Sequence, residues 1–234
     1  MSATRRVIAA LAALATALML VAAPVAADSP GTGPDRKPRL NGPAVQATVP
    51  HYTITTQTGQ SIVPGVTDIG NHGDDTVTTI ALPFPVYVYG APYSSANVSS
   101  NGNIQFDTAD PTFTNVCLPW AAHGHAFFPS WDDLFLVNSG YGIFTKVTGS
   151  APNRTFYIEW RAQYYPGTGT ANFEFSYNEN DQVLKTIYGQ VDNGTASSTT
   201  GVQDAGAGFF DQYGCNGAGG AISGGLAVIY TPPL

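Results

Sequence analysis

Apolar and polar residues alternate through much of the chain after residue 50. Over residues 154–161, Phe156, Ile158 and Trp160 fall on one side of an extended chain, and the residues between them are mostly polar. Residues 171–177 repeat this alternation. A period of two is typical of antiparallel strands that have one dry and one solvated face.

The remaining body of the chain reads as further short strands. About eleven segments rich in β-branched and aromatic residues lie between Gly, Asn, Asp and Pro: HYTITTQ, TVTTIAL, FPVYVYG, ANVSS, NIQF, AFFPSW, GIFTKV, RTFYIEWRAQYY, ANFEFSYN, VLKTIYGQV and GLAVIYT. Asn101-Gly102 is the best hairpin turn among their connections. The pattern predicts an all-β, antiparallel two-sheet β-sandwich of jelly-roll type, with a closed barrel as the alternative.

Composition agrees with a folded β protein. Hydrophobic residues make up 43% of the chain and aromatic residues 12%, so the chain as a whole is not disordered. Charged residues make up 11%, and the formal net charge is −7. Nine Lys and Arg residues cannot neutralise a row of phosphates, which argues against nucleic acid and an anionic membrane surface as partners.

The first 27 residues have the three parts of a secretory signal peptide. Arg5 and Arg6 precede an apolar run over residues 7–23, and small residues end at Ala27. The alternative is a retained membrane anchor, but an Ala-rich run of this length is short for spanning a bilayer. We expect cleavage after Ala27 and a secreted protein without a membrane span in its mature form.

Residues 28–50 read as a linker, and residues 51–234 as one β-sandwich domain. The linker segment contains five prolines, and prolines at such a density block both helices and sheet ladders. They are Pro30, Pro34, Pro38, Pro43 and Pro50.

Two cysteines, Cys117 and Cys215, lie beyond the expected cleavage point. In an exported protein such a pair most simply forms one disulfide, here joining the middle of the sandwich to its C-terminal loop. Two free buried thiols are the alternative.

Several motifs occur in a recurrent order: LPFPVYVYGAPYSSANVSSNGNIQF, AFFPSWDDL, GIFTKVTGSAPNRTFYIEWRAQYY, FEFSYNENDQVLKTIYGQV and GVQDAGAGFFDQYGCN. This order resembles the nidogen-type (NIDO) extracellular domain over roughly residues 81–230, and a secreted bacterial β-sandwich module of that kind. The resemblance implies an extracellular, non-catalytic module for binding, adhesion or display. It brings no active site with it.

His123, His125, Asp132 and Asp133 are the candidate metal ligands. Residues i and i+2 of a strand point the same way, so the two histidines could share an ion with one of the aspartates. Asp132 and Asp133 could instead bind calcium, which prefers hard oxygen ligands. The alternatives are histidines that bond backbone carbonyls and an aspartate that fixes a turn. No other cofactor is expected.

Glu159 and Glu174 carry the enzymatic alternative. On neighbouring strands their carboxylates could face each other, as in carbohydrate-active hydrolases built on jelly-roll sheets. The alternative is structural: Arg161 lies on the same face, so these glutamates could equally form an ordinary cross-strand charge pair with it. The chain contains no GxSxG motif for a serine nucleophile.

Tyr157, Arg161, Tyr164 and Tyr165 are the candidate surface for binding an extracellular protein or glycan. Aromatic side chains on a sheet face can stack on sugar rings or anchor a protein partner. Cover by a neighbouring strand or loop is the alternative. The sequence thus favours a binding module without catalytic residues, with the hydrolase as the second hypothesis.

Overall fold

The structure, a computed structural model, describes residues 51–121 and 123–233. The expected signal peptide (1–27) and linker (28–50) lie outside these residues. Within the described part the chain forms strands and no helix, so no helix there could cross a membrane.

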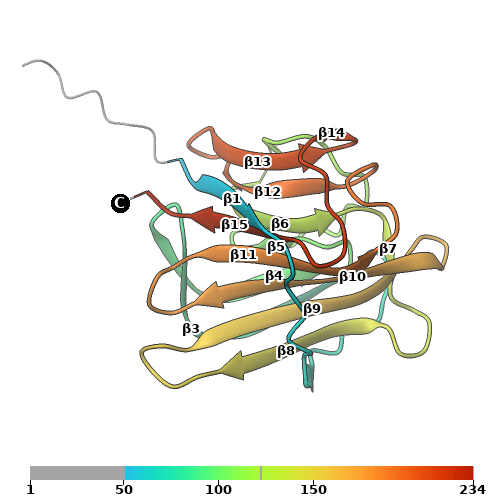
Figure 1. The fold of residues 1–234 in the computed structure, drawn as a ribbon, viewed down its shortest axis with the longest axis horizontal. Coiled ribbons are helices and arrows are strands. Elements are labelled where there is room, and N and C mark those ends of the chain that lie inside the picture. Colours follow the sequence, from blue (N-terminus) through green and yellow to red (C-terminus); the bar gives the residue numbers. More distant parts are fainter. Residues whose placement is uncertain (1–50, 122, 234) are drawn as a thin grey trace, which may run out of the picture. The chain divides into compact units, whose positions relative to one another are not determined.

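One sheet has eight strands, all pairs of which are antiparallel (Figure 1). Its order is β1 (Thr53–Gln57), β15 (Ala227–Thr231), β11 (Leu184–Val191), β10 (Thr168–Asn178), β9 (Thr155–Tyr164), β8 (Gly142–Thr148) and β2 (Thr67–Asp68), with β7 (Leu134–Phe135) also pairing β9. The run from β8 to β11 is a meander, so strands close in sequence are neighbours in the sheet.

The other sheet has seven strands and is also antiparallel. Its order is β14 (Ala218–Gly219), β13 (Phe209–Cys215), β12 (Thr199–Asp204), β6 (His125–Trp131), β5 (Ile104–Gln105), β4 (Ala91–Ser99) and β3 (Val77–Val88). Strand β3 joins two segments expected separately and has an irregular register between Ala81 and Val86, around Pro83 and Pro85.

The two sheets pack face to face around an aromatic core. Phe127 of β6 contacts Phe175 of β10 and Tyr230 of β15, with ring centroids 5.2 and 5.3 Å apart. Across the same interface, Trp160 Nε1 donates a hydrogen bond to Ser99 O at 2.9 Å. The predicted β-sandwich is therefore confirmed, and the closed barrel is not formed.

The predicted hairpin at Asn101-Gly102 is also confirmed. Strands β4 and β5 pair on either side of it, and Gly102 has a φ of +74°. A Cβ at Gly102 would clash with Ser130 O, so this turn needs glycine for space as well as for conformation. Strands β12 and β13 were not among the expected strands, because glycine interrupts their alternation at Gly201 and Gly214.

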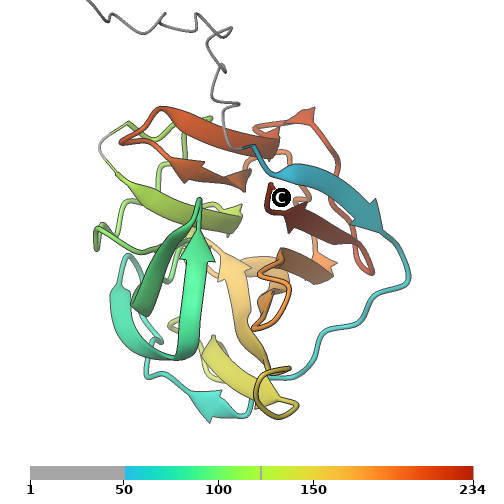
Figure 2. The ribbon, with the colours of Figure 1, turned by 90° about the vertical axis from the view of Figure 1, so that its left-hand side faces the viewer.

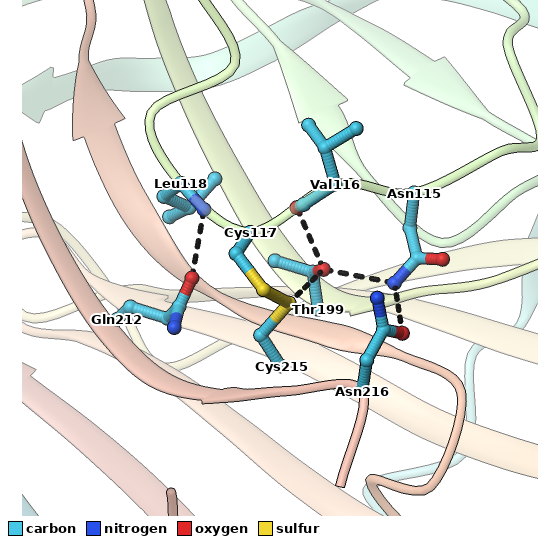
Figure 3. Close-up of a disulfide and its surroundings, with 8 residues drawn as sticks. All are labelled: Asn115, Val116, Cys117, Leu118, Thr199, Gln212, Cys215 and Asn216. Carbon is cyan, nitrogen blue, oxygen red and sulfur yellow. Dashed lines mark hydrogen bonds between the residues drawn. A yellow bond between two sulfur atoms is a disulfide. The ribbon is translucent and has the colours of Figure 1, made fainter. Parts of the chain in front are cut away.

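The loop between β5 and β6 covers the outer face of the seven-stranded sheet. Its Leu118 packs with Ala126, Phe128 and Trp131, which point away from the main core. The predicted disulfide is present: Cys117 in this loop is bonded to Cys215, and their Cα atoms are 5.5 Å apart (Figure 3). Hydrogen bonds from Leu118 N to Gln212 Oε1 (2.7 Å) and from Thr199 Oγ1 to Val116 O (2.9 Å) hold the loop on both sides of the disulfide.

A second crossing segment covers the outer face of the eight-stranded sheet. Residues 58–66, here called the strap, connect β1 and β2, which lie at opposite edges of that sheet. In Figure 2 the strap runs along the outside of the sheet from the end of β1. Both faces of the sandwich are thus partly covered by irregular chain.

Candidate binding site

A pocket lies where loops from both sheets meet. Its volume is about 290 Å³, and it is lined by Asp74, Asp75, Phe113, Asp133 and Tyr165. We call it the acidic pocket. Two of its residues, Asp133 and Tyr165, are among the predicted site residues.

Hydrogen bonds position the parts of the acidic pocket. Tyr165 N donates to Asp133 O at 3.0 Å, so the β9–β10 turn is tied to the β6–β7 turn. Trp131 Nε1 donates to Thr112 O at 3.0 Å, which fixes the segment that carries Phe113. The pocket is therefore built on strand ends of the rigid sandwich.

Three carboxylates converge in the acidic pocket. One carboxylate oxygen from each of Asp74, Asp75 and Asp133 lies within 4.8 Å of the other two. Asp74 is placed by an isolated bridge to Phe135, and Asp75 Oδ1 accepts a hydrogen bond from Asn101 Nδ2 at 2.8 Å. Such an all-oxygen set suits a hard cation or a protonated amine.

The charge of these carboxylates is not compensated by the described residues. None of the ion pairs among residues 51–121 and 123–233 includes them, and Asp74 Oδ1 is buried without a hydrogen-bond partner. Partial burial, together with the nearby carboxylates of Asp75, Asp74 and Asp132, raises the pKa of Asp133. Partial burial and Asp75 likewise raise the pKa of Asp74. A bound cation would relieve this repulsion.

Two exposed aromatic rings lie beside the carboxylates. The exposed fraction of Phe113 is 46% and that of Tyr165 is 54%. Tyr165 rests edge-on against Phe135, with centroids 6.0 Å apart. Aromatic rings next to anionic groups can bind the apolar stem and the charged head of a basic side chain together.

Asp132, the neighbour of Asp133, does not join the pocket. It is buried, its Oδ2 accepts a hydrogen bond from Ser197 Oγ at 2.7 Å, and its Oδ1 accepts one from Asp133 N at 2.9 Å. Burial raises its pKa. Asp132 therefore fixes the turn, which was one of the alternatives for this pair, and of the two aspartates only Asp133 lines the acidic pocket.

The two histidines do not share a ligand, and no histidine belongs to the acidic cluster found in the described residues. His123 stacks on Trp120, and its Nε2 lies 3.0 Å from Asp110 Oδ2. His123 precedes β6, which begins at His125, so the expected same-side geometry of a strand does not extend to it. His123 and His125 contact different aspartates.

His125 has a different set of partners. Its Nδ1 lies 2.8 Å from Tyr93 Oη and 3.0 Å from Asp107 Oδ2, and its Nε2 lies 3.4 Å from Asp204 Oδ2. These contacts join β4, β6 and β12. In this geometry the two candidate histidines have separate sets of hydrogen-bonding partners.

Glu159 and Glu174 do face each other across β9 and β10, as expected. Both are buried beneath the strap, where Gly65 N donates to Glu159 Oε2 and Val63 N donates to Glu174. The hydrolase hypothesis needs these carboxylates in an open cleft. In this structure they bind the backbone of their own chain.

The expected aromatic surface patch is dispersed. Tyr164 points into the core, because it has the parity of Trp160 along β9 and not that of Tyr157. Its assignment to the outer face was wrong. Arg161 lies under the strap, Tyr157 is half-buried, and Tyr165 belongs to the acidic pocket.

The sequence-based search missed Asp74, Asp75 and Phe113. The pair Asp74-Asp75 forms a second Asp-Asp doublet, and this similarity to Asp132-Asp133 was the available signal. Only the packing of the β2–β3 loop against the β6–β7 turn brings the two doublets together.

The two antiparallel sheets and the pocket between their loops place this protein in the class of β-sandwich domains with a candidate binding site. A protein-family model described as NIDO related matches residues 51–221. This match spans well over half of the chain, and the chain belongs to the NIDO-related family. No curated protein and no solved structure matches it.

Proposed function

We propose that this protein is a secreted, non-catalytic module that binds an extracellular partner through the acidic pocket. The observation that carries the proposal is the group of three uncompensated carboxylates beside two exposed aromatic rings. The NIDO-related family supports an extracellular binding role. The chemistry of the pocket favours a protein that presents an Arg or Lys side chain over a neutral glycan.

A binding array of extracellular-matrix proteins and glycans, probed with residues 28–234, tests this proposal. We expect binding to a protein with an exposed basic segment. Asp133→Asn should lower the affinity for this protein at least tenfold. Adding Phe113→Ala to that variant should lower the affinity further. Asp181→Asn is the matched control, because it removes the same charge from the exposed β10–β11 turn. Equal affinity of the Asp133→Asn and Asp181→Asn proteins would overturn the proposed site.

Calcium is the second candidate ligand of the same pocket. Asp74, Asp75 and Asp133 supply oxygen ligands only, which fits Ca²⁺ better than a softer metal. Calorimetric titration of chelator-treated protein with CaCl₂ should then give one site, and Asp133→Asn should abolish it. If no heat is detected up to millimolar CaCl₂, the basic-side-chain ligand alone remains.

The non-catalytic part of the proposal has its own test. Glu159 and Glu174 are engaged by the strap and are not free to act on a sugar. We expect no hydrolysis of a glycoside and polysaccharide panel. Hydrolysis that Glu174→Gln removes would restore the hydrolase alternative.

Secretion is proposed from the leader sequence. N-terminal sequencing of protein recovered outside the producing cell should begin at Asp28. If the protein is recovered only with the cells and still carries Arg5 and Arg6 of the leader, secretion would be contradicted.

A further inference from the structure

The strap crosses the outer face of the eight-stranded sheet (Figure 1). Backbone hydrogen bonds hold it at both ends. Gln60 N donates to Gly225 O at 2.9 Å, before β15. Val66 N donates to Thr145 O at 3.0 Å in β8. Between these points the strap spans the central strands β11, β10 and β9.

Two buried glutamates hold the middle of the strap. Val63 N donates to both carboxylate oxygens of Glu174, at 3.0 and 3.1 Å, and Gly65 N donates to Glu159 Oε2 at 2.8 Å. The exposed fraction of Glu159 is 4% and that of Glu174 is 0%. The two residues are directly opposite in the β9–β10 register, where Cβ atoms lie about 5 Å apart.

The two carboxylates differ in their compensation. Glu159 Oε2 accepts a hydrogen bond from Arg161 Nη2 at 2.7 Å, and its Oε1 accepts one from Asn172 Nδ2 at 2.9 Å. Glu174 has only the amide of Val63 among its hydrogen-bond partners in the described residues. An ionised Glu174 would therefore be a second buried anion without a cation in contact.

The charged groups that face Glu174 come from three strands. Glu159 of β9 repels its negative form, while Lys146 of β8 and Lys185 of β11 attract it from a distance. The strap itself, TGQSIVPGV, has no charged residue. Release of the strap would admit water and remove the cost of ionising Glu174.

We propose that the strap is an acid-tightened clasp: neutral Glu174 keeps it closed over the carboxylate pair, and ionisation of Glu174 favours its release. Opening of the clasp exposes Glu159 and Glu174 at the centre of the sheet face. The proposal concerns the strap alone and does not depend on the acidic pocket.

The pKa of Glu174 is consistent with this geometry. Burial is the largest influence and Glu159 adds to it, while the Val63 amide and the two lysines oppose them; together they raise the pKa to about 8. With the strap open, the side chain returns towards the ordinary value of about 4.3. The open state therefore loses its proton first as pH rises. Opening should increase between pH 5 and about 8 and level off above that, when both states are ionised.

Hydrogen exchange of the Val63 and Gly65 amides between pH 5 and 9 tests the proposal. After division by the intrinsic exchange rate, protection should fall by up to about tenfold per pH unit until about pH 8. Glu174→Gln keeps an acceptor for Val63 N but cannot ionise, so its strap protection should not vary with pH. Amides of the β9–β10 ladder are the internal control and should stay protected in both proteins.

The outcomes are distinct. Strap protection in the wild-type protein that is constant from pH 5 to 9 would overturn the proposal, even if the variant fails to fold. The same pH dependence in Glu174→Gln and in the wild type would also overturn it. Loss of protection in the β9–β10 ladder together with the strap would show global unfolding in place of a clasp.

Discussion

Asn101 anchors Asp75 in the acidic pocket through a 2.8 Å hydrogen bond from Asn101 Nδ2 to Asp75 Oδ1. The same side chain donates to Pro111 O at 2.9 Å and accepts from Leu134 N at 2.9 Å. A fully buried residue of the β4–β5 turn therefore connects three other segments, each of which carries or adjoins a pocket residue. The hairpin turn is thus also a support for the candidate site.

Replacement of Asn101 by Ala should destabilise the protein. It leaves the buried Leu134 N–H without an acceptor, which costs about 1–3 kcal/mol. Urea unfolding monitored by tryptophan fluorescence should show the lower midpoint. Asn180→Ala is the control, because Asn180 is exposed and should unfold like the wild type. Equal midpoints for both variants would show that Asn101 is not a structural anchor.

Reduction of the Cys117–Cys215 disulfide should lower the melting temperature. The bond closes a loop with a sequence separation of 98, and the chain-entropy model assigns about 4–5 kcal/mol to a loop of this size. Calorimetry with and without reductant measures the difference. The double variant Cys117→Ser/Cys215→Ser should melt like the reduced protein and not respond to reductant. Two titratable thiols in unreduced, denatured protein would contradict the bond.

Gly65→Ala should displace the strap. A Cβ at this position would lie 2.6 Å from Phe144 Cβ and 2.8 Å from the Phe144 carbonyl carbon, so the neighbour cannot simply rotate away. Overpacking of this kind costs about 1–3 kcal/mol. Thermal unfolding measures this loss, with the exposed Ser61→Ala as the control in the same segment. Identical melting of both variants would show that the strap tolerates the added methyl group.

Asp107→Asn should reduce stability at neutral pH but not in strong acid. Burial of Asp107 opposes ionisation, but hydrogen bonds from His125 N and Tyr93 Oη outweigh it and lower the pKa. The stability gained from a lowered carboxyl pKa is present above the unfolded-state value near 3.9 and disappears as pH falls through the folded-state value. Unfolding free energies at pH 7 and pH 3 should show a larger difference between wild type and variant at pH 7 than at pH 3. An equal difference at both would contradict this origin.

The local pattern was sufficient for most strands. Alternation over residues 154–161 placed Trp160 in the core, and Asn101-Gly102 gave the β4–β5 turn. The same parity rule places Tyr164 with Trp160 on the inner face, so the sequence itself carries the information that Tyr164 is buried. The glycine-interrupted strands β12 and β13 had no comparable local pattern.

The candidate site depended on contacts between segments that are distant in sequence. Asp75 and Asp133 are 58 positions apart, and no local pattern relates their loops. Glu159 and Glu174 were placed correctly on facing strands, but the residues that cover them come from the strap, more than 90 positions earlier in the chain.

The sequence by itself determined most of the strands, which face of most strands is apolar, and which two cysteines can pair, because these depend on period, turn chemistry and count. The tertiary structure decided that Asp74 and Asp75 join Asp133, that Asp132 does not, and that a strap closes over the two glutamates. The physical reason is that a carboxylate's role depends on the groups that surround it. Those groups are brought together by the packing of loops whose own sequences carry no periodic signal.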